Sequence, residues 1–357
     1  MLAVVYATDH KLSLQEMPEP KCASDGLLVR VGSCAICGSD VKMFKAPDPR
    51  VKPPQIVGHE FVGEVIEVGP EIQSISQAKG DIAFRPGDRV VMATTLSCMA
   101  CQYCWSGKTN LCPNVMPVSR AFPGAFAPYI PIPWEGIRAG NTVKVPKELQ
   151  DDGACLAEPL SCAVNAQQLA GVRAGQTVVI VGGGPLGALN AELAKANGAT
   201  RIIVSQRSKA RQDLIAALDV DSVINAQDED PVAQVKKLTG GKGADVVIVA
   251  APDRKAQEQA LEMARKGGMV NLFAGMSRDE PEITINSRLV HYGEISITGS
   301  SDSTARHVQT AVNLLAAGRI NWEKIVTHRF PLSRFFEGMQ VMLDRTGLKV
   351  AIKPQER

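Results

Sequence analysis

The residues TVVIVGGGPLG at positions 177–187 are the most informative stretch of this chain. The apolar run at its start is typical of a buried parallel strand. The glycines then fit the pattern G-x-G-x-x-G: Gly182 would allow a tight turn, Gly184 a close backbone approach to a pyrophosphate, and Gly187 close helix–strand packing. Pro185 and Leu186 would begin a helix whose free N–H groups attract phosphate. The stretch therefore predicts a dinucleotide-binding turn.

The sequence around this turn supports the same prediction. Short apolar runs at 201–205, 222–225, 245–250, 268–273 and 295–299 alternate with helical patterns. The helical patterns cover 186–197, 209–218 and 255–265. Buried strands joined by helices predict a doubly wound parallel sheet, which we place at residues 157–296. The alternative, a glycine-rich turn without a ligand, fits this context less well.

The flanking regions differ from this part of the chain in composition and residue pattern. Residues 1–156 are rich in glycine and proline, and residues 61–68 alternate with period two, which predicts a mostly β domain. Residues 297–357 contain one helical pattern, at 305–317, and closing strands. We expect this tail to return to the first domain, because it is too small to form a core alone.

Composition narrows the function classes. The 357 residues carry a net charge of +2 and only 4% aromatics, which gives no reason to expect nucleic acid as a partner. No apolar run is long enough to span a membrane, and no signal-like segment is evident at the start. We therefore expect a cytoplasmic protein, in which the nine cysteines serve as metal ligands or catalytic groups rather than disulfides.

Four of those cysteines are clustered. Cys98, Cys101, Cys104 and Cys112 have the spacing C-x2-C-x2-C-x7-C within a lobe at about 94–115. Four thiolates suit a closed structural zinc site. An iron–sulfur cluster is the rival interpretation, since Cys112 precedes a proline, but ferredoxin-like runs have three residues in the last gap where this chain has seven. The spacing favours zinc.

Three short motifs stand far apart: Cys37-Gly-Ser-Asp40, Gly58-His-Glu60 and Glu158-Pro159. Together with the cysteine lobe and the glycine turn, in this order, they resemble the zinc-containing medium-chain dehydrogenase family. The resemblance is strongest to the branch of sorbitol (polyol), threonine and glucose dehydrogenases, which has glutamate where alcohol dehydrogenases place a second cysteine. It implies an α/β fold, with a GroES-like, mostly β catalytic domain and a Rossmann doubly wound parallel-sheet domain.

The resemblance also implies a mechanism. A catalytic zinc would be held by Cys37, His59 and either Glu60 or Glu158, in addition to the structural zinc. It would act as a Lewis acid on the hydroxyl of a polyol, sugar or other small alcohol while a nicotinamide accepts hydride. Ser39 would carry the hydroxyl proton outward, and Asp40 would orient His59.

Two positions depart from the family pattern. Lys42 stands where members often have a histidine that passes the proton on, so the end of the relay is open. The run 299–303, GSSDS, lacks an arginine that sorbitol dehydrogenases tend to have near the substrate. The family also implies a homodimer or homotetramer, and the alternation at 282–286 predicts an edge strand that could pair across a two-fold axis.

The coenzyme is predicted from the end of the strand at 201–205. In NAD-specific folds an acidic residue about 20 positions past the glycines binds the ribose hydroxyls. Here that position is Gln206, followed by Arg207 and, one helix turn on, Arg211. Glutamine does not repel a 2′-phosphate and arginine attracts one, so we expect NADP(H), with NAD(H) as the alternative.

The same fold is compatible with other functions. A non-catalytic protein that binds nucleotide and zinc would not need the complete set of ligand-type residues. A zinc-free quinone or enoyl reductase would need neither Cys37 nor His59. A dehydrogenase of a non-polyol alcohol, such as an amino-acid alcohol, remains an alternative, because the sequence does not specify the substrate.

Overall fold

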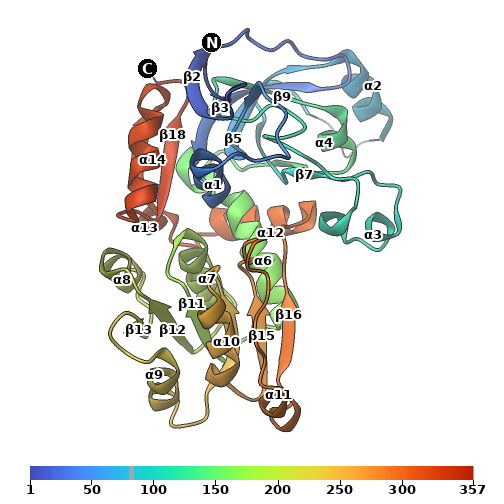
Figure 1. Cartoon of the computed structure of the whole chain (residues 1–357). Helices are drawn as coiled ribbons and strands as arrows, with labels where there is room; N and C mark the ends of the chain where they lie inside the picture. The colour runs from blue at the N-terminus through green and yellow to red at the C-terminus, as the bar shows by residue number, and fades with distance from the viewer. Residues whose placement is uncertain (80–83, 357) are drawn as a thin grey trace.

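The computed structural model describes residues 1–79 and 84–356. Within these ranges the chain forms a β-rich part and a parallel-sheet part, the upper and lower halves of Figure 1. The parallel sheet has six described strands. Their order across the sheet is β13 (Ser222–Asn225), β12 (Arg201–Gln206), β11 (Thr177–Val181), β14 (Ala244–Val249), β15 (Ala264–Leu272) and β16 (Ser296–Gly299).

The predicted doubly wound sheet is confirmed. All five ladders in this sheet are parallel. The centre of β11 is fully buried, because side chains on both of its faces are covered by neighbouring layers. The connecting helices are α7 (Pro185–Ala196), α8 (Lys209–Ala216), α9 (Pro231–Leu238), α10 (Arg254–Met263) and α11 (Ser287–Gly293).

The β-rich part is built mainly of antiparallel strands, as its period-two pattern predicts. Its larger sheet runs β10 (Thr142–Lys144), β6 (Arg89–Met92), β5 (Glu60–Val68), β3 (Leu27–Ala35), β18 (Lys349–Lys353) and β17 (Val326–Pro331), with β9 (Tyr129–Ile132) also paired to β3. Smaller sheets hold β1 (Leu2–Tyr6), β2 (Leu12–Glu16) and β4 (Gln55–Ile56), and β7 (Thr95–Leu96) with β8 (Met116–Pro117).

The last strands of the chain belong to this first sheet. Strand β18 pairs with β3 through Ala351 and Ala35, and β17 extends the sheet from β18. Asp152 fixes the returning segment, because its carboxylate accepts hydrogen bonds from Arg329 at 2.5 Å and from Lys353. These charged contacts outweigh burial and lower the pKa of Asp152.

Two helices lie between the sheets and join the two parts. Helix α6 (Ala157–Ala170) packs against α12 (Ala305–Ala316), and Figure 1 shows both at the centre of the molecule. One continuous apolar cluster includes Val62 from the first sheet, Leu160 from α6, Ile180 from the parallel sheet and Val308 from α12. The two parts therefore share a core instead of meeting only through a linker.

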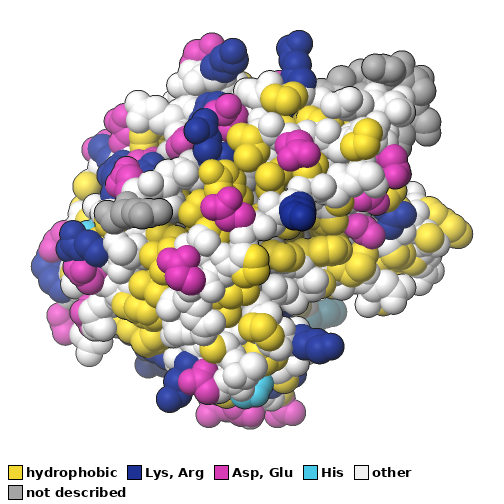
Figure 2. Space-filling model, turned by 90° about the horizontal axis from the view of Figure 1, so that it is seen from above, with side chains coloured by type: hydrophobic (Ala, Val, Ile, Leu, Met, Phe, Trp, Pro, Cys, Tyr) yellow, Lys and Arg dark blue, Asp and Glu magenta, His cyan; other side chains and the backbone are white. Residues whose placement is uncertain are grey.

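The remaining helices are short, and most lie in the β-rich part. Among the described residues, no helix is long and apolar enough to cross a bilayer. Figure 2 shows cationic and anionic side chains interspersed on the visible face. These helices are α1 (Gly38–Lys45), α2 (Pro70–Lys79), α3 (Gln102–Trp105), α4 (Trp134–Arg138), α5 (Asp151–Ala154), α13 (Trp322–Ile325) and α14 (Phe335–Asp344), with 3-10 turns at Thr109–Leu111 and Leu332–Arg334.

The predicted edge strand at 282–286 pairs with no other described strand of this chain. In the structure this described segment forms no ladder and leads into α11. The backbone N–H of Thr284 is bonded to the side chain of Glu258 at 2.8 Å, and the Asn286 side chain caps α11. Within the chain, β16 is the last described strand on this side of the sheet, and pairing of 282–286 with a second copy stays a prediction.

Candidate metal centres and dinucleotide groove

The turn between β11 and α7 has the geometry that its glycines predict. Gly182 has φ +106°, a conformation that residues with a side chain rarely adopt. A Cβ on Gly187 would lie 1.9 Å from the carbonyl oxygen of Gly182, so only glycine lets the helix approach the turn this closely. The free N–H groups at the start of α7 face the end of the strand, where an anion can bind.

A groove of about 740 Å³ opens beside this turn. Its walls include Gly182 and Gly184 from the turn and Gln206, Arg207 and Arg211 from the next βα unit. The Gln206 side chain accepts a hydrogen bond from the Gly183 N–H at 3.3 Å. Five of the eight predicted coenzyme residues therefore line one cavity, while Pro185, Leu186 and Gly187 do not line it.

The two arginines of this βα unit have different surroundings. Arg207 forms an ion pair with Asp253, at 3.1 Å. The Nε atom of Arg211 is buried and has no hydrogen-bond partner among the described residues. Burial, followed by repulsion from Arg345, lowers the pKa of the Arg211 guanidinium to about 10. Arg211 is thus the cation in this groove that most clearly lacks a counter-ion.

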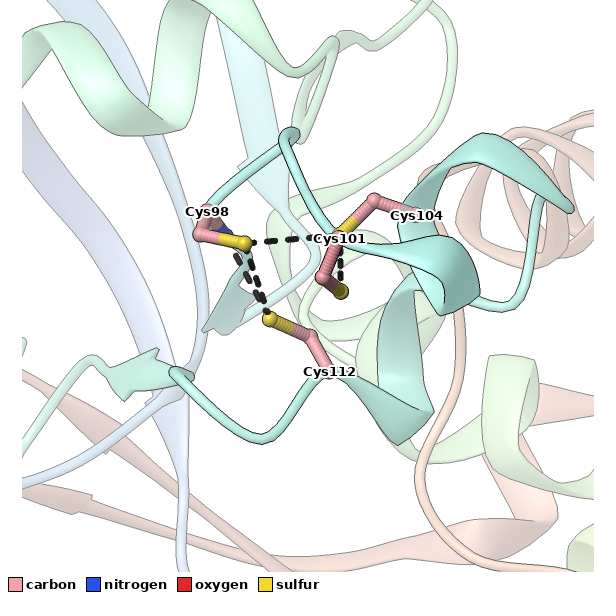
Figure 3. A group of neighbouring side chains, drawn as sticks. All are labelled: Cys98, Cys101, Cys104 and Cys112. Carbon is pink, nitrogen blue, oxygen red and sulfur yellow. Dashed lines mark hydrogen bonds between the residues drawn. The ribbon is translucent and has the colours of Figure 1, made fainter.

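The four clustered cysteines converge, as Figure 3 shows. The Sγ atoms of Cys98 and Cys112 are 3.4 Å apart, those of Cys101 and Cys104 are 3.5 Å apart, and those of Cys98 and Cys104 are 4.0 Å apart. Four sulfurs about 2.3 Å from one zinc ion would be separated by about 3.8 Å at tetrahedral geometry. The donor set fits zinc.

The backbone around these cysteines favours thiolates. N–H groups of Ala100 and Asn114 point at the sulfurs of Cys98 and Cys112, at 3.5 and 3.4 Å. The bond from Ala100, followed by that from Cys112, lowers the pKa of the Cys98 thiol to about 6, while burial raises the pKa of the Cys112 thiol to about 11. The loop thus favours the thiolate at Cys98, and a bound cation would be needed to deprotonate all four cysteines.

A second donor group forms where α1 meets β5. Cys37 precedes α1, while His59 and Glu60 stand at the start of β5, and their donor atoms lie within 4.8 Å of one another. Burial, with a contribution from Glu60, raises the pKa of the Cys37 thiol to about 12. A bound dication would reverse this effect, because a coordinating thiol is deprotonated outright. One sulfur, one imidazole and one carboxylate are the ligands of an open, catalytic type of zinc site.

Asp40 organises this group from α1. One carboxylate oxygen accepts the backbone N–H of Cys37 at 2.9 Å, and the other lies 4.0 Å from Nδ1 of His59. That second oxygen is buried and otherwise without a partner among the described residues. Asp40 therefore faces one ring nitrogen of His59, an arrangement that leaves the other nitrogen available for a metal.

The two candidate glutamates are held differently. Both carboxylate oxygens of Glu60 accept hydrogen bonds from the ammonium group of Lys349, one of them at 2.5 Å, and both side chains are about 1% exposed. Burial alone would lower the pKa of Lys349, but the contact with Glu60 raises this pKa above its usual value. Glu158 accepts only a hydrogen bond from Thr94, at 3.2 Å. Burial raises the pKa of Glu158 to about 8, against the opposing effect of His59.

Three residues in this region escaped the sequence analysis. Lys349 is the one basic residue of the apolar run LKVAI at 348–352. A single charge in such a run indicates a buried partner of opposite charge, which is the signal that could have identified it. Asp302 and Cys162 place donor atoms within 4.8 Å of Glu158, although Cys162 reads as a packing residue in the sequence. Asp302 also has φ +57° and accepts a hydrogen bond from Thr95. Its contacts lie some 140 and 200 positions away, so no local pattern reveals them.

Comparisons with known proteins match both parts of the chain to one family. The family described as "Alcohol dehydrogenase GroES-like domain" matches residues 23–147, and "Zinc-binding dehydrogenase" matches residues 185–317. The L-threonine 3-dehydrogenase of Thermococcus kodakarensis is 34% identical, over 96% of this chain and 95% of its own. The sorbitol dehydrogenase of Halalkalibacterium halodurans is 32% identical, over 98% and 97%.

Solved structures show the same likeness. The alcohol dehydrogenase TADH from Thermus sp. ATN1 superposes with a TM-score of 0.87 at 30% identity, with 99% of each chain covered. A zinc-binding dehydrogenase from Sinorhizobium meliloti 1021, solved with NADP bound, also gives 0.87, at 27% identity and with 99% of each chain covered.

The fold, the donor groups and these relatives define an oxidoreductase that uses zinc and a nicotinamide coenzyme. The chain belongs to the zinc-containing medium-chain dehydrogenase family, in the branch that includes threonine and polyol dehydrogenases.

Proposed function

We propose that this enzyme oxidises a hydroxyl group of a small polyol, sugar or amino-acid alcohol and transfers the hydride to NADP⁺. The observation that carries this proposal is the group Cys37, His59 and Glu60, beside a second, separate group of four cysteines. We assign one zinc ion to each group. At the first, the ion would supply Lewis-acid chemistry that lowers the pKa of the substrate hydroxyl.

The protein residues supply the rest of the reaction. Asp40 fixes His59, and Lys349 holds Glu60 in place and offsets its charge. We infer that Glu60 is the third ligand, since its carboxylate lies with Cys37 and His59, and that Glu158 lies beside the substrate. Ser39 follows Cys37 in the first turn of α1, where its hydroxyl can take up the substrate proton and pass it to solvent.

An amino-acid alcohol is a second candidate substrate. Asp302 and Glu158 place two carboxyl groups near each other, and an ammonium group bound between them would favour the charged form of Glu158 and form charge-assisted hydrogen bonds with both. The missing arginine at 299–303 removes a contact expected for sorbitol. Initial rates with a panel of polyols, sugars and L-threonine, measured with both coenzymes, test the proposed function. No activity with any alcohol would contradict it.

The coenzyme preference gives a specific expectation. Gln206→Asp should shift kcat/KM toward NAD⁺, because a carboxylate there repels a 2′-phosphate and bonds a free ribose. Arg207→Ala should weaken NADP⁺ far more than NAD⁺, since a charge-assisted bond contributes about 1.5–3 kcal/mol, or at least about tenfold. Steady-state kinetics with both coenzymes measure this. An unmodified enzyme that used NAD⁺ equally well would show that the coenzyme assignment is wrong.

We also propose a homodimer or homotetramer, in a reducing, cytoplasmic setting that suits its free thiols. The assembly is supported by β16, the end strand of the parallel sheet, with Ile297 37% exposed and nearby Tyr292 64% exposed. Ile297→Lys should shift the protein toward monomers in light scattering, because a charge on an edge strand opposes pairing. Ile66→Lys is the matched control, since Ile66 is equally exposed, at 37%, on a strand of the other sheet. An unmodified protein that was monomeric at micromolar concentration would refute the assembly.

A further inference from the structure

The coenzyme groove receives a cation from outside the parallel-sheet part. Arg345 lies directly after α14, in the segment that returns to the β-rich part, yet it lines the same cavity as Arg211 and Gly184. Figure 1 shows α14 above α8, on the same side of the molecule. The groove is therefore bounded by both parts of the protein, and each contributes an arginine.

These two arginines face a shared space without a counter-ion. Neither forms an ion pair within residues 1–79 and 84–356, and repulsion from Arg345 reaches the half-buried Arg211. The Arg211 guanidinium lies over the glycine turn, because a Cβ on Gly184 would be 3.5 Å from its Nη1 atom. Two cations held near each other at a phosphate-binding turn form a site for an anion.

Among the described residues, no acidic side chain of the groove forms an ion pair with Arg211 or Arg345. Asp253 pairs with Arg207 and caps α10, while Asp230 caps α9. Asp228 accepts a hydrogen bond from the Asn225 side chain at 2.7 Å, and Glu229 accepts the Asn225 N–H at 3.2 Å. These carboxylates keep their charge, but their contacts orient them toward their own wall and not toward the two arginines.

The backbone at Arg345 is a second, independent observation. This residue ends α14 in the left-handed conformation, with φ +59°, where helices usually place glycine. A non-glycine residue at such a position costs free energy, and strain of this kind often occurs at ligand sites. The chain has a glycine at Gly347, two positions later, but not at the left-handed position. That position carries a long cation instead.

We propose that Arg211 and Arg345 together bind one phosphate of the dinucleotide, so that the coenzyme links the two parts of the molecule. This inference rests on the proposed function and adds Arg345 to its coenzyme residues. The phosphate is either the 2′-phosphate, which only NADP(H) has, or the pyrophosphate, which both coenzymes share. In either case Arg345 contributes to coenzyme affinity from outside the nucleotide-binding sheet.

The test is direct binding of NADPH and NADH to the zinc-loaded enzyme, measured by the change in coenzyme fluorescence. Arg345→Gln should weaken NADPH about tenfold or more, as expected for one lost charge-assisted bond. A loss confined to NADPH assigns the 2′-phosphate, and an equal loss with NADH assigns the pyrophosphate. Arg334→Gln is the matched control, because Arg334 precedes the same helix and pairs with Glu337.

Two further variants keep the test independent of folding. Arg345→Gly suits the left-handed backbone, so it should not lower the thermal midpoint of the coenzyme-free enzyme, yet it should reduce the increase in midpoint that NADPH produces. Arg211→Met removes the charge but retains an apolar stem. If both arginines bind one phosphate, the fold-loss of NADPH affinity in a variant that combines Arg211→Met with Arg345→Gln should be smaller than the product of the two single fold-losses.

Unchanged NADPH and NADH affinity in Arg345→Gln, with tight binding to the unmodified enzyme, would overturn the inference and leave the proposed function intact. An unmodified enzyme that bound neither coenzyme would overturn both.

Discussion

Cys37→Ser is expected to lower kcat by about a thousandfold or more without unfolding the enzyme. A metal ion contributes several kcal/mol of charge stabilisation to such a reaction, and each 1.4 kcal/mol corresponds to about a factor of ten in rate. Cys37 begins α1 and contributes the only sulfur of its donor group, while Asp40 keeps the backbone contact that caps the helix. Serine therefore removes a zinc ligand but preserves the helix start.

Three measurements check this expectation: steady-state rates, zinc content by atomic emission and thermal unfolding by circular dichroism. The variant should retain about one zinc per chain and unfold near the temperature of the unmodified enzyme. Cys22→Ser is the control, because Cys22 is half-buried, contacts only backbone carbonyls and belongs to neither donor group. Full activity in a Cys37→Ser variant that lacks the corresponding zinc would contradict the assignment.

Cys101→Ser should also lose one zinc, but in contrast to Cys37→Ser its main effect should be a fall in stability. Structural zinc contributes roughly 10–16 kcal/mol to small zinc-finger peptides; we expect about 3–5 kcal/mol here, because the lobe is only one part of the chain. Cys101 also precedes α3, and serine suits such a position, so the loss would come from the ligand and not from the helix cap.

Thermal unfolding and metal analysis measure this effect, again against Cys22→Ser. Limited proteolysis should cut the variant first within the lobe. In the intact protein the Asn110 side chain donates a hydrogen bond from this lobe to the carbonyl of Ser301, at 2.9 Å, and we expect loss of the zinc to loosen this contact. Iron and sulfide in the purified enzyme, or a single metal ion in the active chain, would refute the two-zinc assignment.

The parts of the fold that could be predicted are those in which local signals agree. At β11 an apolar run, a glycine turn and a proline-led helix all indicate one structure, and φ +106° at Gly182 shows why the glycine is required. Residues 282–286 form no ladder within the chain, because alternation describes one strand, whereas pairing depends on a neighbour. Glu258, 26 positions away, bonds the Thr284 N–H there.

At the site, too, local motifs indicate single residues but not the distant residues that contact them. Resemblance could indicate Cys37, His59 and Glu60, but the partner of Glu60 is Lys349, 289 positions away. Similarly, the sequence indicates Arg207 for a phosphate, but it does not show that Arg207 also pairs with Asp253, 46 positions away, or that Arg345 reaches the groove. Interactions over such separations depend on topology, which no local pattern records.

Because β18 pairs with β3, the order of synthesis has a consequence for how the enzyme matures. Residues 34–35 are synthesised more than 300 positions before their partners at 351–352, so the first sheet cannot close until that later segment has left the ribosome. The parallel sheet, whose strands end at Gly299, can form earlier. Lys349, whose ammonium group balances Glu60, lies in the same later segment. Nascent chains that lack this segment should therefore not yet hold the catalytic metal ion firmly.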